Sequence, residues 1–183
     1  ALRYDEFMDV KEVPKAKALL AVGMDRAKAL HAGHAPWNAQ TGLVVRGYRS
    51  DIDGSVQPHG LLIPDDFKPG EKTARRLGFW CHGRGEKLTE LAFLDGSMRS
   101  KGGFASGFTT PGIVCFLYGR FCNANKFAGE RDLFEALDDI KKHYAIDMQR
   151  LVIRGFSMGG AACWQFAVHY PGKWCAAAPG AGF

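Results

Sequence analysis

The feature that most constrains the fold is a G-x-S-x-G motif at residues 155–159. The apolar residues 151–153 before it are typical of a strand and residues 158–170 of a helix, so the chain must turn from strand to helix within about one residue. Such a turn strains the backbone of Ser157 and exposes its hydroxyl, and the helix directs free N–H groups at the serine oxygen. The motif therefore predicts a nucleophilic Ser157; the alternative is a glycine-rich turn with an incidental serine.

The rest of the chain alternates short apolar segments with amphipathic ones. The Asp53-Gly54 pair between the first two apolar segments is a turn signal and predicts an antiparallel hairpin. Strands that alternate with helices after such a hairpin indicate an α/β fold, with a mostly parallel sheet and helices on both faces. The expected strands are residues 42–48, 60–63, 77–81, 113–118, 151–153 and 174–178, and the expected helices are residues 88–94, 130–144 and 158–170.

The first forty residues differ in composition from the rest. Residues 11–34 are rich in alanine, lysine and leucine, and Pro14 stands where a helix would begin. Apolar residues between Leu19 and Leu30 are spaced so that they can form one helical stripe. We therefore expect residues 1–40 to form a helical arm that packs on a main body of residues 41–183.

Composition and charge exclude several classes of protein. The 183 residues carry a net charge of +5, from 24 Lys and Arg against 19 Asp and Glu, and the basic residues are scattered, so we expect no nucleic-acid partner. No stretch approaches the roughly 20 apolar residues that a membrane-spanning helix needs, so we expect no membrane partner. The five cysteines show no CxxC spacing, which argues against a zinc site. We expect no metal.

A second group of candidate residues follows the third expected strand, in the run His82-Gly83-Arg84-Gly85. A serine nucleophile needs two backbone N–H donors for the negative charge that develops on the substrate carbonyl oxygen. One comes from the residue after the serine, Met158, and the other from the loop after the third strand. We assign the second to Arg84, which two glycines flank, with Gly83 as the alternative. His82 is expected to orient this loop rather than to act as a base.

These motifs together resemble the α/β-hydrolase superfamily, in particular its prolyl-oligopeptidase-like and polyhydroxyalkanoate-depolymerase-like esterase branch. The resemblance rests on the run 82–85, on Asp147-x-x-Arg150 ahead of the fifth strand and on the run 155–160, and it covers residues 41–183. It implies an α/β-hydrolase fold and a serine hydrolase that cleaves a small-molecule carboxylic ester through an acyl-enzyme on Ser157. It implies no cofactor and no metal.

The sequence departs from this family in one respect. Such hydrolases continue through two more strands, with the triad acid after the seventh strand and the histidine after the eighth, whereas Phe183 lies just past the sixth. His169 lies 12 residues beyond Ser157 on the same helix, about 18 Å along its axis, which is out of reach. We therefore expect a fold truncated after the sixth strand. The remaining C-terminal part of the domain, in the same protein or in another chain, would then supply the acid and the histidine.

The loop after the fourth expected strand, residues 119–130, is the candidate substrate-binding segment. Its start faces the carboxyl ends of the strands, where ligands bind in open α/β sheets. The loop combines cations, amides and aromatic rings, and Arg120, Asn123 or Lys126 could hold a polar or acidic substrate. The alternative is a solvated loop that hydrogen bonds only to itself.

Two other functions share these sequence features. A serine peptidase of the prolyl-oligopeptidase type uses the same turn around its nucleophile. A non-catalytic fragment with a binding or structural role is the alternative from another class.

Overall fold

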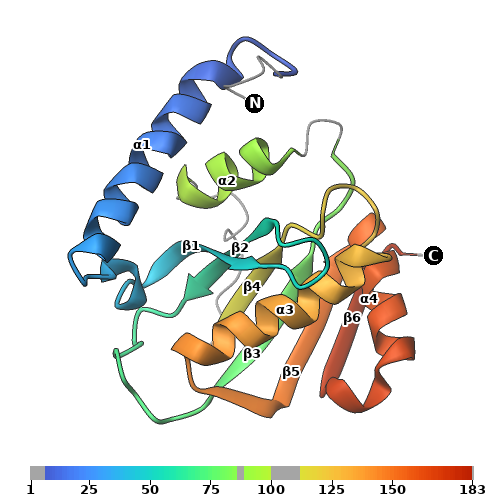
Figure 1. The fold of residues 1–183 in the computed structure, drawn as a ribbon. Coiled ribbons are helices and arrows are strands. Elements are labelled where there is room, and N and C mark those ends of the chain that lie inside the picture. The colour runs from blue at the N-terminus through green and yellow to red at the C-terminus, as the bar shows by residue number, and fades with distance from the viewer. Residues whose placement is uncertain (1–6, 86–88, 100–111, 183) are drawn as a thin grey trace.

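A single six-stranded sheet organises the chain in the computed structural model, which describes residues 7–85, 89–99 and 112–182 (Figure 1). Part of the expected arm, residues 1–6, and residue 88 of an expected helix therefore lie outside the described residues. The strands are β1 (Gly42–Arg49), β2 (Val56–Ile63), β3 (Arg75–Cys81), β4 (Ile113–Leu117), β5 (Ile146–Phe156) and β6 (Ala176–Gly180). The helices are α1 (Glu12–His31), α2 (Glu90–Arg99), α3 (Ala128–His143) and α4 (Met158–His169), with short 3-10 turns η1 (Pro36–Asn38) and η2 (Pro171–Lys173).

The strands lie in the order β1-β2-β4-β3-β5-β6. β1 and β2 form the expected antiparallel hairpin, and Gly54 in its turn has a φ of 72°, which favours glycine. β2 also pairs antiparallel with β4, whereas β4, β3, β5 and β6 run parallel to one another. The mostly parallel sheet predicted from the sequence is therefore confirmed.

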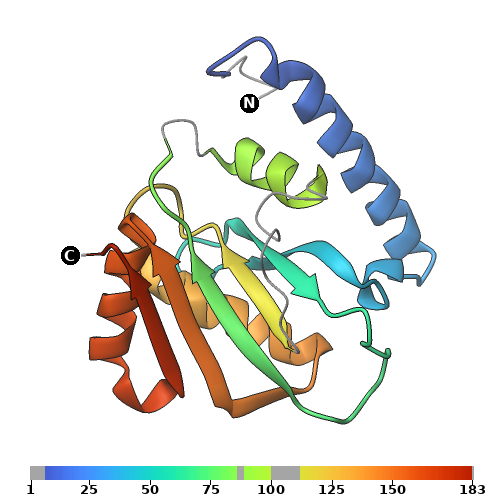
Figure 2. The same ribbon diagram turned by 180° about the vertical axis from the view of Figure 1, so that it is seen from behind.

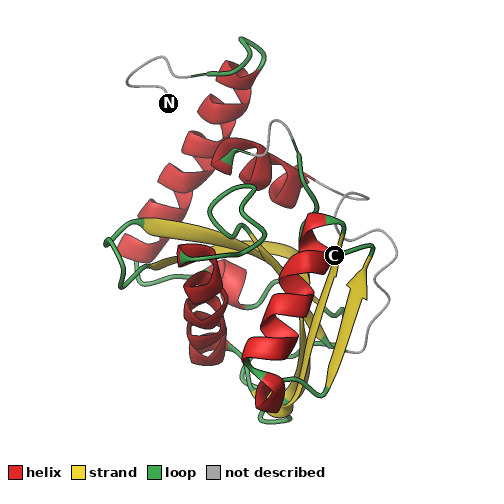
Figure 3. Ribbon diagram, turned by 90° about the vertical axis from the view of Figure 1, so that its right-hand side faces the viewer, coloured by secondary structure: helices red, strands yellow, loops and turns green. Residues whose placement is uncertain are grey.

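Helices cover both faces of the sheet (Figures 1 and 3). Under α3 and α4 lies the larger hydrophobic core, to which β4 contributes Ile113, Cys115 and Leu117. On the opposite face Val114 and Phe116 of the same strand pack against Phe93 of α2. Side chains that alternate between two cores explain why the sequence of β4 is apolar throughout.

The sixth strand forms one edge of the sheet. β6 pairs only with β5 among the described strands, and Ala176, Ala177 and Ala178 are exposed. No described helix lies over the back of β5 and β6, as the view from behind shows (Figure 2). On the outside of α4, Trp164 and Val168 are 53% and 70% exposed. The edge that the sequence predicts after the sixth strand is thus open in the described structure.

The first helix differs from the sequence expectation in its packing. α1 contacts α2 through an ion pair of Lys15 with Asp95 at 3.2 Å, and Arg26 donates to the carbonyl oxygen of Val45 at 2.7 Å. No residue of α1 is buried, however, and Leu20 is 55% exposed. Polar contacts at two points therefore hold the arm, and the apolar stripe predicted from the sequence lies mainly in solvent.

None of the described helices has the length and apolar character needed to cross a membrane. Within the same residues, no group of three His, Cys, Asp or Glu side chains is placed to hold a metal ion.

Candidate active site

Ser157 occupies a sharp turn between β5 and α4. Its φ of 56° and ψ of −122° lie in a region that L-residues rarely adopt. Two backbone hydrogen bonds hold this conformation: the Ser157 N–H donates to the Gly180 carbonyl oxygen at 2.8 Å, and the Ser157 carbonyl oxygen accepts from Ala161 N–H at 3.1 Å. The side chain is exposed. The structure therefore contains the strained strand-to-helix turn that the sequence predicts.

The glycines around Ser157 are required by close backbone packing. A Cβ on Gly155 would lie 2.1 Å from the carbonyl oxygen of Gly159, and a Cβ on Gly159 would lie 2.0 Å from the carbonyl oxygen of Cys81. At Gly160 a Cβ would lie 2.3 Å from the carbonyl oxygen of Gly180. The turn is therefore packed against the ends of both β3 and β6, and a side chain at any of the three positions would force it apart.

The loop after β3 lies directly beside this turn. A Cβ built on Gly83 would be 3.8 Å from the Cβ of Ser157. His82 is buried, with Nδ1 2.8 Å from the Gly83 carbonyl oxygen and Nε2 3.0 Å from the Tyr118 carbonyl oxygen at the end of β4. Because both ring nitrogens face backbone carbonyls, these contacts favour the loop-orienting role expected for His82.

Cys122 holds the same loop from the other side. Its thiol donates to the Gly85 carbonyl oxygen at 3.2 Å, and the Gly85 N–H donates to the sulfur at 3.5 Å. This half-buried, unpaired cysteine thus joins the loop after β4 to the loop after β3. Sequence reasoning missed the contact, because a single cysteine in a polar loop gives no sign of a partner 37 residues away.

A pocket of about 660 Å³ opens between these two loops, next to the Ser157 turn. It brings together four of the residues that the sequence singled out for the site: Arg84, Asn123, Lys126 and Met158. Ser157 itself does not line the pocket but directly precedes Met158. The full lining is Arg84, Gly85, Phe121, Cys122, Asn123, Ala124, Lys126 and Met158.

Arg120 has a different environment from the one expected. Its guanidinium donates to Asp132 at 2.9 Å, to Asp53 at 2.8 Å and to Ser50 at 2.7 Å. Burial raises the pKa of Asp132 even though Arg120 opposes that shift, whereas hydrogen bonds from Ser55 and then Arg120 lower the pKa of Asp53 to about 2. These contacts tie the loop to α3 and to the β1–β2 turn. They favour an anchoring role for Arg120 in place of the substrate contact suggested by the sequence.

No histidine of the described residues contacts the Ser157 hydroxyl. His59 of β2 and His143 of α3 both lie near Asp139 of α3, with Nε2 3.6 Å and 3.9 Å from its carboxylate. His169 lies at the end of α4, with Nδ1 3.4 Å from a carboxylate on α3. A catalytic base for Ser157 is therefore not found in the described part of the chain.

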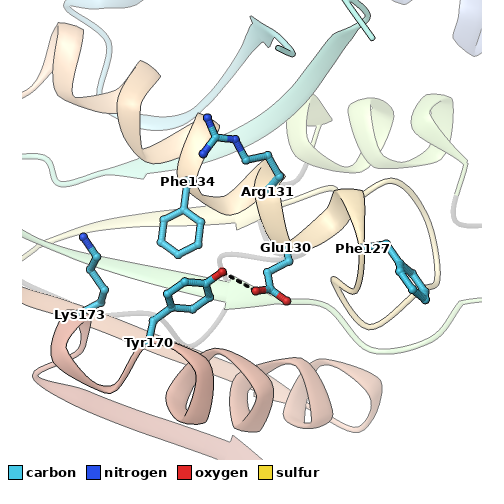
Figure 4. A pocket seen from close by; sticks show the side chains of 6 residues that line it. All are labelled: Phe127, Glu130, Arg131, Phe134, Tyr170 and Lys173. Atoms are coloured by element: carbon cyan, nitrogen blue, oxygen red, sulfur yellow. Dashed lines mark hydrogen bonds between the residues drawn. The ribbon is translucent and has the colours of Figure 1, made fainter. Parts of the chain in front are cut away.

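A second pocket of about 520 Å³ lies between α3 and the C-terminal end of α4 (Figure 4). Glu130 points toward Tyr170 in it and accepts hydrogen bonds from the Tyr170 hydroxyl and from Gln165, both at 2.5 Å. The carboxylate thus joins the two helices and is not available as a triad acid for Ser157. Phe127 at the rim is 89% exposed.

Comparisons with known proteins agree with this architecture. No protein-family model matches the chain, and no curated protein matches it. Among solved structures, it is similar to a ferulic acid esterase, with 20% identity and a TM-score of 0.52 over 74% of this chain and 58% of that one. It is also similar to FphF, a fluorophosphonate-binding serine hydrolase of Staphylococcus aureus, with 15% identity and a TM-score of 0.51 over 75% of this chain and 56% of the other. A thermostable esterase matches with 22% identity and a TM-score of 0.50, over 73% of this chain and 40% of its own.

The chain thus spans between 40% and 58% of the length of these neighbours. At such low identities the likeness establishes the fold and not the activity. Together with the strand order, it defines the chain as having the α/β-hydrolase fold, through the sixth strand.

Proposed function

We propose that this chain carries the nucleophile and the oxyanion hole of a serine hydrolase that cleaves carboxylic esters. The observation that carries the proposal is the strained Ser157 turn between β5 and α4, packed against the loop after β3. Strain of this kind persists only where the surrounding structure imposes it, and it is common at catalytic residues. The esterases and serine hydrolase among the structural neighbours support the same reaction class.

The geometry supports a two-step reaction. The Ser157 hydroxyl attacks the ester carbonyl carbon, its proton passes to a base, and the carbonyl oxygen becomes an oxyanion. Met158 is the first residue of α4, so its N–H has no partner within the helix and can donate to that oxyanion. The second donor is the N–H of Arg84, or of Gly83, in the loop beside Ser157. The alcohol leaves, and water then releases the acid from the acyl-enzyme.

We further propose that the triad acid and histidine come from another part of the hydrolase domain, in the same polypeptide or in another chain. Two observations support this. No described histidine contacts Ser157, and β6 has an unpaired edge onto which further strands can add. The runs 82–85 and 155–160 favour the prolyl-oligopeptidase-like and polyhydroxyalkanoate-depolymerase-like branch for the complete enzyme.

Ser157→Ala tests the proposal in the complete protein. We expect a fluorophosphonate probe to label the wild-type protein but not this variant, and hydrolysis of p-nitrophenyl acetate to fall at least a thousandfold, because the nucleophile itself is removed. Thr73→Ala is the matched control, because Thr73 is exposed in the loop before β3, outside the pocket, and this variant should keep both activities. Equal labelling and turnover in the Ser157→Ala variant would refute the assignment. Peptide anilides as parallel substrates separate an esterase from a peptidase.

A further inference from the structure

The lining of the pocket beside Ser157 carries a net positive charge. Two of its eight lining residues, Arg84 and Lys126, are cations, and none is acidic. Both side chains are exposed, and neither forms an ion pair within the described part of the chain. The two cations come from different loops, one after β3 and one after β4, so the tertiary fold and not local sequence places them around one pocket.

Three carboxylates that lie near Lys126 in the sequence or contact its loop are engaged elsewhere. Asp132 and Asp53 hold Arg120, with 2.9 Å and 2.8 Å between the paired atoms. Glu130 accepts hydrogen bonds on the far side of α3, in the pocket of Figure 4. These three acids therefore do not neutralise the positive charge of the pocket. Glu130 and Asp132 are close to Lys126 in the sequence, and Asp53 contacts Arg120 of the same loop.

The loop that carries Lys126 is strained and firmly anchored. Five of its residues other than glycine have φ between 51° and 80°: Arg120, Phe121, Ala124, Asn125 and Phe127. Such conformations are unfavourable for residues other than glycine, so this one must be imposed by its surroundings. The three hydrogen bonds of Arg120 hold one end, and the buried Asn125 donates to the Gly129 carbonyl oxygen at 3.4 Å at the other. The anchored loop contributes Phe121, Asn123 and Lys126 to the lining of the pocket.

From this arrangement we infer that the pocket binds an anionic group, such as a carboxylate, carried by the ester substrate. Lys126 and the Arg84 side chain attract the anion, Asn123 adds an amide contact, and Phe121 packs against the apolar part of the substrate next to it. The inference rests on the proposed ester hydrolysis at Ser157 and narrows its substrates to esters with a negative charge near the scissile bond. The anionic group can belong to the acyl part or to the alcohol part of the ester, and the two arms of the experiment distinguish these two cases.

The test compares matched esters on the complete enzyme. The acyl arm uses mono-p-nitrophenyl glutarate against p-nitrophenyl valerate, and the alcohol arm uses 4-acetoxybenzoate against its methyl ester. In one arm we expect kcat/KM to be about tenfold higher for the anionic ester, and the preference should shrink as salt rises from low to high ionic strength. Lys126→Ala should reduce the preference about threefold or more, and Lys126→Glu should reverse it. Lys68→Ala is the control, because it removes the same charge from the loop before β3, outside the pocket.

The outcomes separate the anion site from the reaction. If neutral esters are hydrolysed and neither arm shows a preference that depends on Lys126, the anion site is refuted and the hydrolase stands. If fluorophosphonate does not label Ser157 and no ester is cleaved, the proposed function fails. The anion site is then decided by calorimetric titration of monomethyl glutarate into the Ser157→Ala protein. Binding that Lys126→Glu abolishes and Lys68→Ala preserves supports the site, and the absence of binding refutes it.

Discussion

At the scale of single residues, the site depends on contacts made by the backbone. The glycines next to Ser157 permit the close approach of β3, β5 and β6, and His82 holds its loop through two carbonyl oxygens. A motif with fixed spacing can predict such a turn, because the strained serine and its glycines are neighbours in the sequence. The contacts that hold the neighbouring loop are not local, and they determine the position of the proposed second oxyanion donor.

Cys122 gives the sharpest prediction at this scale. Cys122→Ala removes both hydrogen bonds to Gly85, so the loop proposed to supply the second oxyanion donor is held less firmly. Thiol hydrogen bonds are weak, so we expect kcat of the complete enzyme to fall roughly three- to tenfold with little change in KM. Steady-state hydrolysis of p-nitrophenyl acetate measures kcat and KM separately.

The matched control for Cys122 is Cys175→Ala, because Cys175 is exposed and lies outside the pocket. It should leave kcat unchanged. Cys122→Ser retains a donor and an acceptor and should recover part of the loss. A Cys122→Ala enzyme with the wild-type kcat would show that the thiol does not position the loop.

At the scale of secondary-structure elements, α3 packs over a buried polar group as well as over the core. His59 of β2 is fully buried, and neither ring nitrogen has a hydrogen-bond partner among the described residues. Asp139 lies 3.6 Å from it, but the same carboxylate also lies 3.8 Å from Arg46. Burial, followed by the positive charges of Arg46 and His143, lowers the pKa of His59 to about 3. The contact between α3 and the hairpin therefore holds this imidazole in its neutral form.

Stability should consequently fall in acid. The unfolded chain binds a proton at His59 below about pH 6.5, whereas the folded protein does so only near pH 3. The free energy of unfolding should therefore drop as pH falls from 6.5 toward 3, by up to about 1.4 kcal/mol per pH unit from this group. Urea unfolding at pH 7.5 and pH 5 measures the drop. His59→Leu should flatten it, and His31→Ala on the exposed end of α1 should not. Equal pH dependence in the wild-type and His59→Leu proteins would contradict the assignment.

The elements themselves were largely predictable. The alternation of apolar and amphipathic segments locates all six strands, and the apolar spacing of α3 matches its buried face. The packing of α1 was not predictable, because an apolar stripe shows only that a helix can be buried and not that a surface exists to receive it. The contacts of Arg120 were not predictable for a similar reason: one of its carboxylate partners, Asp53, lies 67 residues away, and only the tertiary fold brings them together.

At the scale of the whole molecule, the candidate site residues lie at one end of the sheet, where the parallel strands have their carboxyl ends. The carboxyl ends of β3, β4 and β5 lie side by side, so the loops after them bring Arg84, Lys126 and Met158 around one pocket. Parallel strands impose this arrangement, because their carboxyl ends all lie at the same end of the sheet. The sequence alone predicts which loops meet there, whereas their shapes, with five strained residues in the loop after β4, follow from distant anchors.

The open edge of β6 leads to the last prediction. The run from Ala176 to Gly182 has no charged residue, its first three alanines are exposed, and unpaired strand edges without charges associate readily. We therefore expect residues 1–183, expressed alone, to form oligomers or aggregates whose mass rises with protein concentration, as measured by size-exclusion chromatography with light scattering. Ala177→Lys places a charge on the edge and should shift the protein toward monomer, whereas Ala18→Lys on exposed α1 adds the same charge elsewhere and should not. A monomer at all concentrations would show that this edge does not bind a partner strand. The proposal that further strands of the hydrolase domain add to β6 would then lose its structural support.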